Sequence, residues 1–280
     1  MRLRLPDRLL DLTQPIVMGV LNVTPDSFSD GGRYTAVEAA VERALQMVGE
    51  GAQLLDIGGE SNRPGAPPVS VADELGRVVP VIEALARRTA VPISIDTRKP
   101  EVMEAAVGAG ASLINDVAAL RAPGALAAAA RSGAAVCLMH MQGEPGSMQA
   151  DPRYGDVVAE VRQFLAERVA ACNAAGIASD RLVLDPGIGF GKRLEHNLAL
   201  LARLKDLNVG DCPLLVGVSR KSMFGALLGR AVTDRLAGGL AVATAAVLAG
   251  ARIVRTHDVA PTVDAVKVAM ALQQAGYTSR

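Results

Sequence analysis

Short apolar segments alternate with longer segments of helical periodicity along the whole chain. The apolar segments have the length of buried strands, and each runs into polar or charged residues at its end. They predict strands at residues 17–20, 53–56, 93–95, 113–114, 136–138, 182–184, 214–218 and 253–254. Apolar residues at helical spacing predict helices at residues 36–50, 72–88, 99–107, 124–131, 155–174, 195–204, 233–248 and 262–274.

Alternation of strand and helix is typical of a parallel sheet. Eight such units favour a closed (β/α)8 TIM barrel, and an open doubly wound sheet is the alternative. The short Pro/Gly-rich stretches follow strands directly, as barrel loops do, and no linker is found. We therefore predict a single TIM-barrel domain over residues 1–280, with an N-terminal hairpin around Pro6 and Asp7 that closes the barrel floor.

Composition narrows the range of partners. Lys plus Arg and Asp plus Glu number 29 each, which gives no support to a nucleic-acid surface or a polybasic membrane patch. The most apolar segment, residues 236–250, is shorter than the ~20 residues of a membrane span. The three cysteines are far apart and lack metal-site spacing, which fits a reducing cytoplasm.

Polar side chains at three strand ends suggest a ring-binding site. Asp96, Asn115 and Asp185 each follow an apolar strand, and parallel barrel strands end on one shared face. Each residue alone would also suit a helix N-cap. Together they can accept the paired N–H groups at the edge of an amino heterocycle. We therefore predict that they hold a guanine-like or pterin-like ring.

A second group of side chains is cationic and falls in predicted loops two, seven and eight. Its members are Arg63, Arg220, Lys221, Arg255 and His257. Isolated Lys and Arg are usually solvated surface charges, but loops seven and eight of such barrels habitually bind phosphate. The segment 219–222 also precedes a helix predicted to begin near Met223, whose free amides favour an anion. These residues predict an anion site.

Asn22 follows the first strand in a long, turn-rich loop. A turn-forming role is the simpler interpretation. Its amide oxygen is a weak ligand for a hard cation, so Asn22 would hold Mg²⁺ only together with substrate phosphate oxygens. Residues 187–192 lack the glycine spacing and the following Ser or Thr of a phosphate loop, and the three histidines lack zinc spacing.

These segments resemble the dihydropteroate synthase family from about residue 16 to residue 268. The resemblance is carried by residues 19–32, 56–61, 63–66, 94–97, 115–116, 139–143, 184–192, 217–223 and 255–258. At Asn62 the family commonly has Thr. The resemblance implies a Mg²⁺-dependent transferase of folate biosynthesis, homodimeric and targeted by sulfonamides. Its reaction joins 6-hydroxymethyl-7,8-dihydropterin diphosphate to 4-aminobenzoate and releases diphosphate.

The resemblance also implies roles for individual residues. The pterin would contact Asp96, Asn115, Asp185 and Lys221. The diphosphate would contact Asn22 through Mg²⁺, Arg63, Arg255 and His257. The aminobenzoate would lie among Phe28, Pro64, Phe190, Ser219, Lys221 and Ser222. The catalytic residues would be Asp96, Lys221, Arg255 and His257.

The residue types fit an SN1-like transfer. Cations already in place stabilise the departing diphosphate, and an anion such as Asp96 stabilises positive charge on the pterin methylene. The aromatic amine is uncharged at neutral pH, so it needs neither a strong base nor a covalent intermediate. Two alternatives remain open. A pterin-dependent methyltransferase barrel would not need Arg63, Arg255 and His257, and a non-catalytic pterin-binding paralogue would release no diphosphate.

Overall fold

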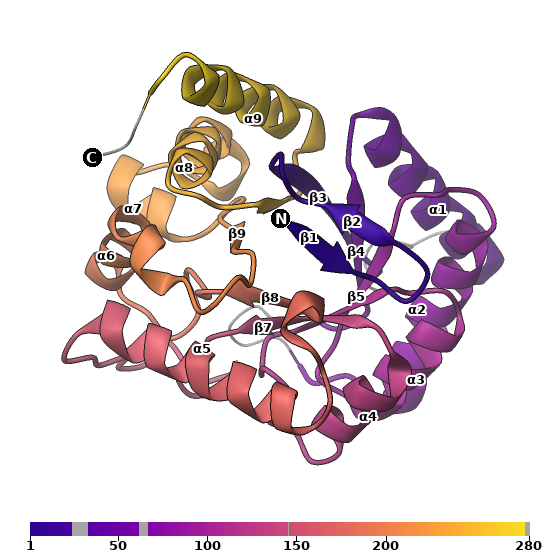
Figure 1. The fold of residues 1–280 in the computed structure, drawn as a ribbon. Coiled ribbons are helices and arrows are strands. Elements are labelled where there is room, and N and C mark those ends of the chain that lie inside the picture. Colours follow the sequence, from indigo (N-terminus) through magenta and orange to yellow (C-terminus); the bar gives the residue numbers. More distant parts are fainter. Residues whose placement is uncertain (24–32, 62–66, 145, 278–280) are drawn as a thin grey trace.

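Eight parallel strands form the centre of the fold, and helices surround them (Figure 1). The structure, a computed structural model, describes residues 1–23, 33–61, 67–144 and 146–277. The central strands are β3 (Ile16–Asn22), β4 (Leu54–Gly58), β5 (Ile93–Asp96), β6 (Leu113–Asp116), β7 (Ala135–Met139), β8 (Leu182–Asp185), β9 (Leu215–Gly217) and β10 (Ile253–Thr256). All eight strands predicted from the sequence are confirmed.

The sheet closes on itself. Its order is β8-β7-β6-β5-β4-β3-β10-β9, with every neighbouring pair parallel. A parallel bridge between Leu184 and Leu214 joins β8 to the residue before β9. The predicted barrel is therefore confirmed, and the open doubly wound sheet is excluded because its two edge strands would not meet.

The helices follow the strands as the periodicity predicts, with ends shifted by a few residues. They are α1 (Arg33–Gly49), α2 (Val71–Ala86), α3 (Pro100–Gly108), α4 (Ala125–Ser132), α5 (Val157–Ala174), α6 (Leu194–Ala202), α7 (Met223–Leu228), α8 (Leu236–Leu248) and α9 (Val259–Gln274). Short 3₁₀ helices are η2 (Ser179–Arg181), η3 (Leu204–Leu207) and η4 (Val232–Asp234). No helix in the described ranges is long and apolar enough to cross a membrane.

Alternation along the strands sorts side chains between two layers of the core. In β4, Leu55 and Ile57 belong to the large cluster between the sheet and the helices, whereas Leu54 belongs to the cluster inside the barrel. Because successive strand residues point to opposite faces, Asp56 points inward with Leu54. The same alternation directs the polar residues near several strand ends towards the barrel mouth: Asn22, Asp96, Asn115, Asp185 and Arg255.

The N-terminal hairpin closes the opposite end of the barrel. Strand β1 (Arg2–Arg4) pairs antiparallel with β2 (Leu9–Asp11), and the pair lies across the strands in Figure 1. Leu3, Leu5 and Leu12 are buried against the first residues of the barrel strands. Full burial of such side chains contributes roughly 1.5–3 kcal/mol each. The predicted floor-closing hairpin is confirmed.

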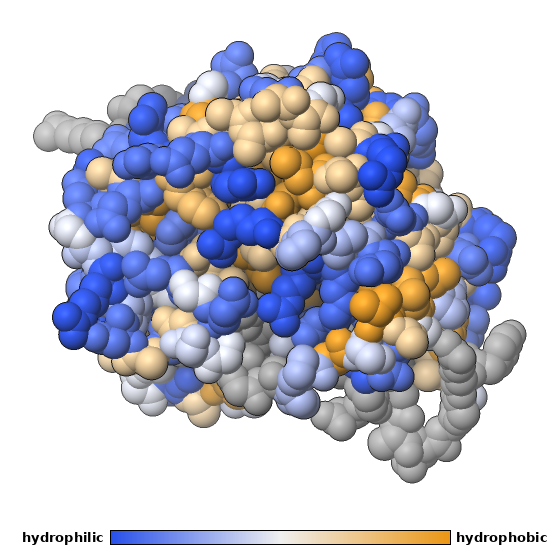
Figure 2. Space-filling view, turned by 90° about the horizontal axis from the view of Figure 1, so that it is seen from below, coloured by the Kyte–Doolittle hydropathy of each residue, from blue (hydrophilic) through white to orange (hydrophobic). Residues whose placement is uncertain are grey.

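Hydrophilic residues cover most of the face shown in Figure 2, with smaller hydrophobic groups between them.

Candidate active site

The C-terminal ends of the barrel strands surround a cavity of about 490 Å³. Ten of the predicted site residues line it: Asn22, Asp96, Asn115, Asp185, Phe190, Ser219, Lys221, Ser222, Arg255 and His257. The remaining predicted residues, Phe28, Arg63 and Pro64, lie outside the described part of the chain. These ten residues come from six different strands or the loops that follow them, and they meet around one cavity because parallel strands all end on the same side.

The predicted ring-binding residues are buried and point inward. Asp96, Asn115 and Asp185 are 7%, 4% and 6% exposed, and Asp96 lies directly beside Asn115 across the β5–β6 pair. None is an N-cap of the following helix, since α3, α4 and α6 are preceded by other residues at that position. The simpler helix-capping interpretation is therefore wrong for all three.

Asp56 is a site residue that the sequence interpretation missed. Its side chain is fully buried, and its Oδ2 accepts hydrogen bonds from Asn115 Nδ2 at 3.0 Å and Arg255 Nε at 2.6 Å. Asp56 thus orients both residues beneath the cavity. The sequence did contain a signal for Asp56. It lies two positions after Leu54 in an otherwise apolar strand, so its side chain points to the same, inner face of the barrel.

Arg255 lies between the acidic residues rather than in a separate cationic group. It donates from Nε to Asp56 and from Nη2 to Asp96 Oδ2 at 2.8 Å. Burial would lower the pKa of Arg255, but the charges of Asp56 and Asp96 outweigh burial and raise the pKa. The sequence suggested two groups of opposite charge, whereas the structure joins them through this one guanidinium.

Lys221 is held over the cavity by the loop after β8. Its Nζ donates a hydrogen bond to the backbone oxygen of Ile188 and lies 4.9 Å from the centre of the Phe190 ring. Burial lowers the pKa of Lys221 to about 8, against the attraction of Asp185. The preceding residue, Arg220, has φ = 60°, a strained conformation for a residue other than glycine. The ammonium therefore reaches the cavity on a tightly constrained backbone.

The loop that carries Asp185 and Phe190 is fixed from behind. Gly187 N donates to Asp185 Oδ1 at 2.7 Å, and burial raises the pKa of Asp185. Lys192 Nζ donates to the backbone oxygens of Gly187 and Phe190, both at 2.9 Å, and lies 2.9 Å from His140 Nδ1. Lys192 therefore stabilises its own loop from a buried position, and it does not line the cavity as a phosphate-loop lysine would.

The basic side chains in the loops after β9 and β10 have different surroundings. Ser219 Oγ lies 3.1 Å from His257 Nδ1, and both side chains line the cavity. Arg220 is exposed and pairs with Asp258 at 2.6 Å. Its charge is therefore largely balanced within the protein. Arg220 lines the cavity together with Lys221, Arg255 and His257, the other members of this group in the described part of the chain.

An apolar wall, also missed in the sequence interpretation, completes the cavity. Val117, Met139 and Met148 form a buried cluster against which Phe190 packs, and all four side chains line the cavity. An apolar wall facing hydrogen-bonding acids is suited to a flat heterocycle, whose faces are apolar and whose edges are polar. Met139 ends β7 in the inward phase, which is the sequence signal for its position.

The described residues offer few oxygen ligands for a metal near Asn22. The Asn22 side chain is exposed at the end of β3, and a β-carbon added at Gly58 would lie 3.7 Å from Asn22 Oδ1 and 3.5 Å from Asp96 Cβ. Within the described residues, no three His, Cys, Asp or Glu side chains form a group that could hold a metal ion. A hard cation bound at Asn22 would thus need most of its ligands from a substrate or water.

Comparisons with known proteins agree with this geometry. The family described as "Pterin binding enzyme" matches residues 18–257. The dihydropteroate synthase of Escherichia coli (strain K12) is 54% identical over 271 residues, 97% of this chain and 96% of that protein.

Two solved structures extend the comparison to the fold. The dihydropteroate synthase of Xanthomonas albilineans with 4-aminobenzoic acid is 55% identical with a TM-score of 0.91, over 97% of this chain and 98% of that one. The Burkholderia cenocepacia dihydropteroate synthase complexed with 7,8-dihydropteroate is 50% identical with a TM-score of 0.90, over 98% and 97%. Since sequence and fold match over nearly the whole chain, the protein belongs to the dihydropteroate synthases of the pterin-binding enzyme family.

Proposed function

We propose that this chain condenses 6-hydroxymethyl-7,8-dihydropterin diphosphate with 4-aminobenzoate, forming 7,8-dihydropteroate and diphosphate. The observation that carries the proposal is the arrangement of Asp96, Asn115 and Asp185 with Lys221 and Arg255 around one cavity of about 490 Å³. Relatives at 50–55% identity bind the second substrate or the product.

The pterin is expected to lie deep in the cavity. Asp185 and Asn115 would bind the polar edge of the ring, and Lys221 would donate to a ring acceptor. Met139 would cover one face of the ring, since it belongs to the apolar wall. Asp56 would act by orienting Asn115.

The diphosphate would lie towards Asn22 and His257. When the bond between the pterin methylene carbon and the diphosphate oxygen breaks, the electron pair leaves with the diphosphate and positive charge develops on the carbon. Asp96 would stabilise that charge, while Arg255 and His257 would stabilise the diphosphate. The aromatic amine then bonds to the carbon and loses a proton to solvent or diphosphate, with no strong base required.

Arg255 binds two acids of the site and can also bind the diphosphate. Its Nε and Nη2 groups bind Asp56 and Asp96, and for Nη1 no partner occurs among the described residues. A fixed guanidinium with one open donor group is preorganised for an anionic ligand. The predicted diphosphate role of Arg63 concerns a residue outside the described part of the chain.

The aminobenzoate would lie near the cavity mouth, beside Phe190, Ser219, Lys221 and Ser222. All four line the cavity, and Ser222 precedes the first residue of α7. Phe190 supplies an aromatic face, and Lys221 supplies a cation for the carboxylate or the ring. Phe28 and Pro64, the other residues predicted here, are not described.

Mg²⁺ fits this arrangement as a substrate-dependent cofactor. Asn22 would provide one oxygen ligand, and diphosphate oxygens and water would provide the others. When bound, the ion would neutralise charge on the leaving group.

A reaction with purified protein tests the proposal. The chain is supplied with the pterin diphosphate, Mg²⁺ and 4-aminobenzoate, and dihydropteroate and diphosphate are measured. We expect both products in equal amounts. Pterin binding without release of diphosphate would instead identify a non-catalytic paralogue, and methyl transfer without a diphosphate requirement would identify the methyltransferase alternative.

We further propose a homodimer that is formed through α7, η4 and α8. Leu227, Leu228, Val232 and Leu236 are between 43% and 52% exposed. A β-carbon at Gly238 would lie 3.0 Å from Leu228 Cδ1, so the end of α7 and the start of α8 share one surface. Sedimentation equilibrium should give a dimer for the native chain and a monomer for Leu228→Glu with Leu236→Glu. A native monomer, or a dimeric variant, would refute this interface.

The cellular location is proposed to be the cytoplasm. Cys137, Cys172 and Cys212 are free and buried, as expected where thiols stay reduced. Locating the tagged chain by cell fractionation tests this.

A further inference from the structure

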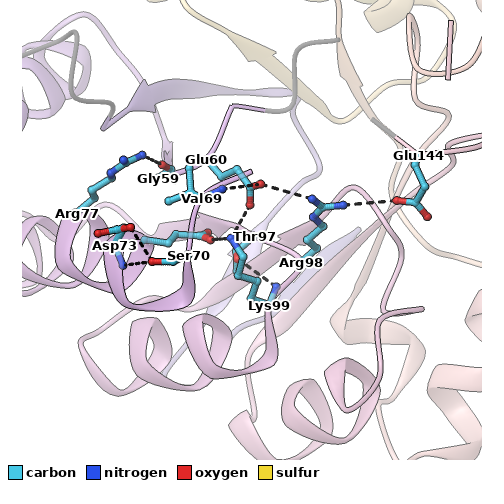
Figure 3. Close-up of polar contacts among 11 residues, drawn as sticks. Gly59, Glu60, Val69, Ser70, Asp73, Arg77, Thr97, Arg98, Lys99 and Glu144 are labelled. Carbon is cyan, nitrogen blue, oxygen red and sulfur yellow. Dashed lines mark hydrogen bonds and ion pairs between the residues drawn. The ribbon is translucent and has the colours of Figure 1, made fainter. Parts of the chain in front are cut away.

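A group of ion pairs lies where the turn after β4 meets the turn after β5 (Figure 3). Lys99 Nζ is 2.6 Å from Glu60 Oε2 and also donates a hydrogen bond to Glu74 Oε2. The Glu74 side chain is fully buried, and the Glu60 side chain is 10% exposed. One ammonium therefore compensates two carboxylates that have little access to water.

Glu74 belongs to the first turn of α2, and the chain after β4 is seated directly on it. A β-carbon at Gly59 would lie 3.0 Å from Glu74 Cγ and 2.8 Å from Val78 Cγ1. Arg77 Nη1 donates to Gly59 O at 2.8 Å. The position of the turn that carries Glu60 is thus tied to α2 by packing and to Lys99 by charge.

Lys99 also belongs to the segment that follows Asp96. Its backbone N donates to Thr97 Oγ1 at 3.2 Å, and Thr97 N donates to Asn115 O at 3.1 Å. Glu60 itself lines the cavity. The Lys99–Glu60 pair therefore connects two sides of the cavity mouth, one ending in Asp96 and the other in Glu60.

The sign of the charges matters for a diphosphate ligand. Burial acts to raise the pKa of Glu60, but the hydrogen bond from Lys99 and the charges of Lys99 and Arg98 outweigh it and lower the pKa. Glu60 is therefore ionised at neutral pH. Arg98 Nη2 is farther away, at 3.4 Å, and also pairs with Glu144 at 3.5 Å. Without Lys99, Glu60 would present an undercompensated negative charge to a diphosphate in the cavity.

We propose that Lys99 is a positioning residue that acts through Glu60. It holds the turn after β4 at the cavity mouth, and it neutralises the Glu60 carboxylate, which would otherwise repel the diphosphate of the substrate. Lys99 does not line the cavity, so its effect is indirect. The inference rests on the proposed function for the identity of the ligand. It adds to that function a residue that raises the affinity for the diphosphate group of the substrate.

The experiment uses four variants of the full chain. Lys99→Met removes the ammonium, and Lys99→Arg keeps a positive charge. Lys99→Met combined with Glu74→Gln removes the buried charge that Lys99 compensates, so that stability recovers while Glu60 still lacks its partner. Arg131→Met is the control, because it breaks an exposed ion pair with Glu104 on α3.

The readouts are urea unfolding, KM and kcat for the pterin diphosphate, and equilibrium binding of inorganic diphosphate. We expect Lys99→Met to be less stable and to raise KM and the diphosphate Kd about tenfold, with kcat nearly unchanged. The double variant should recover stability and keep the raised KM and Kd. Lys99→Arg should recover most of the affinity, and Arg131→Met should resemble the native chain.

Two results would overturn the inference. Unchanged affinity in Lys99→Met would exclude the positioning role, and affinity recovered together with stability in the double variant would reduce Lys99 to a structural role. Diphosphate binding can be measured without turnover. A native chain that forms no dihydropteroate would therefore refute the proposed function while the Lys99 comparison could still be made.

Discussion

Arg255 Nη2 lies 2.8 Å from Asp96 Oδ2, although 159 positions separate the two residues in the chain. The same guanidinium binds the fully buried Asp56. Binding and stability are therefore connected at the centre of the site, because the cation placed for an anionic ligand also compensates two acids of the barrel.

Arg255→Met should weaken both turnover and folding. Turnover should fall at least about a hundredfold, as expected when a preorganised charge is lost. The free energy of unfolding should fall by about 3–5 kcal/mol, because Asp56 and Asp96 lose their buried partner. Steady-state kinetics and urea unfolding measure the two effects. A stable Arg255→Met chain would mean that the two acids are compensated elsewhere.

Affinity for the pterin should decrease above about pH 8. Burial lowers the pKa of Lys221 to about 8, so raising the pH removes the proton that the ammonium would donate to the ligand. Each further pH unit should weaken binding by up to about tenfold. Titration of the pterin from pH 6 to 10 measures this. Lys221→Arg should lack the alkaline decline, and a persisting decline would assign it to another group.

Gly189→Ala should weaken substrate binding through Lys221. Gly189 has φ = +82°, and an added β-carbon would lie 3.2 Å from Lys221 Cδ. Gly210→Ala is a matched control, because Gly210 has φ = +56° and nothing within 4 Å of the added carbon. Both variants should lose roughly 1 kcal/mol of stability from backbone strain. A raised KM is expected for Gly189→Ala alone, and equal KM values would show that Lys221 adjusts freely.

Asn22→Ala should raise the Mg²⁺ concentration needed for binding the pterin diphosphate. Asn22 would supply one oxygen ligand, while the diphosphate and water would supply the others, so the shift should be modest, about tenfold or less. Isothermal titration at several Mg²⁺ concentrations measures it. Binding of a pterin without phosphate should be independent of both Mg²⁺ and the substitution. Magnesium-independent binding of the diphosphate substrate would rule out the metal role.

Acid should destabilise the fold through His140. Burial, with the charges of Lys192 and Arg121, lowers the pKa of His140 from 6.5 to about 2. The unfolded chain therefore binds a proton below pH 6.5 that the folded chain does not. Because acid favours the state that binds the proton, the free energy of unfolding decreases as the pH falls below 6.5. The slope should approach ~1.4 kcal/mol per pH unit. Urea unfolding between pH 7 and 4 should show a smaller decline for His140→Gln than for the native chain or His196→Gln.

The sequence alone determined the barrel and the polar strand-end residues that line the cavity. A parallel barrel brings every strand end to one face, so an inward-phase polar residue such as Asp96 or Asp185 needs no long-range information to be assigned to the site. The hairpin was also predicted locally, from a turn around Pro6 and Asp7, and the structure buries its Leu3 and Leu12 against the barrel floor.

Tertiary structure decided which charges meet. The sequence placed Arg255 and Asp96 on the same face but in separate groups. In the barrel the strands follow one another in the order β10-β3-β4-β5, and Arg255 pairs with Asp56 and Asp96. Likewise, the sequence does not indicate which residues Lys99 and Lys192 contact. Ion-pair partners depend on distances of a few ångströms between residues far apart in the chain, and only the folded geometry sets those distances.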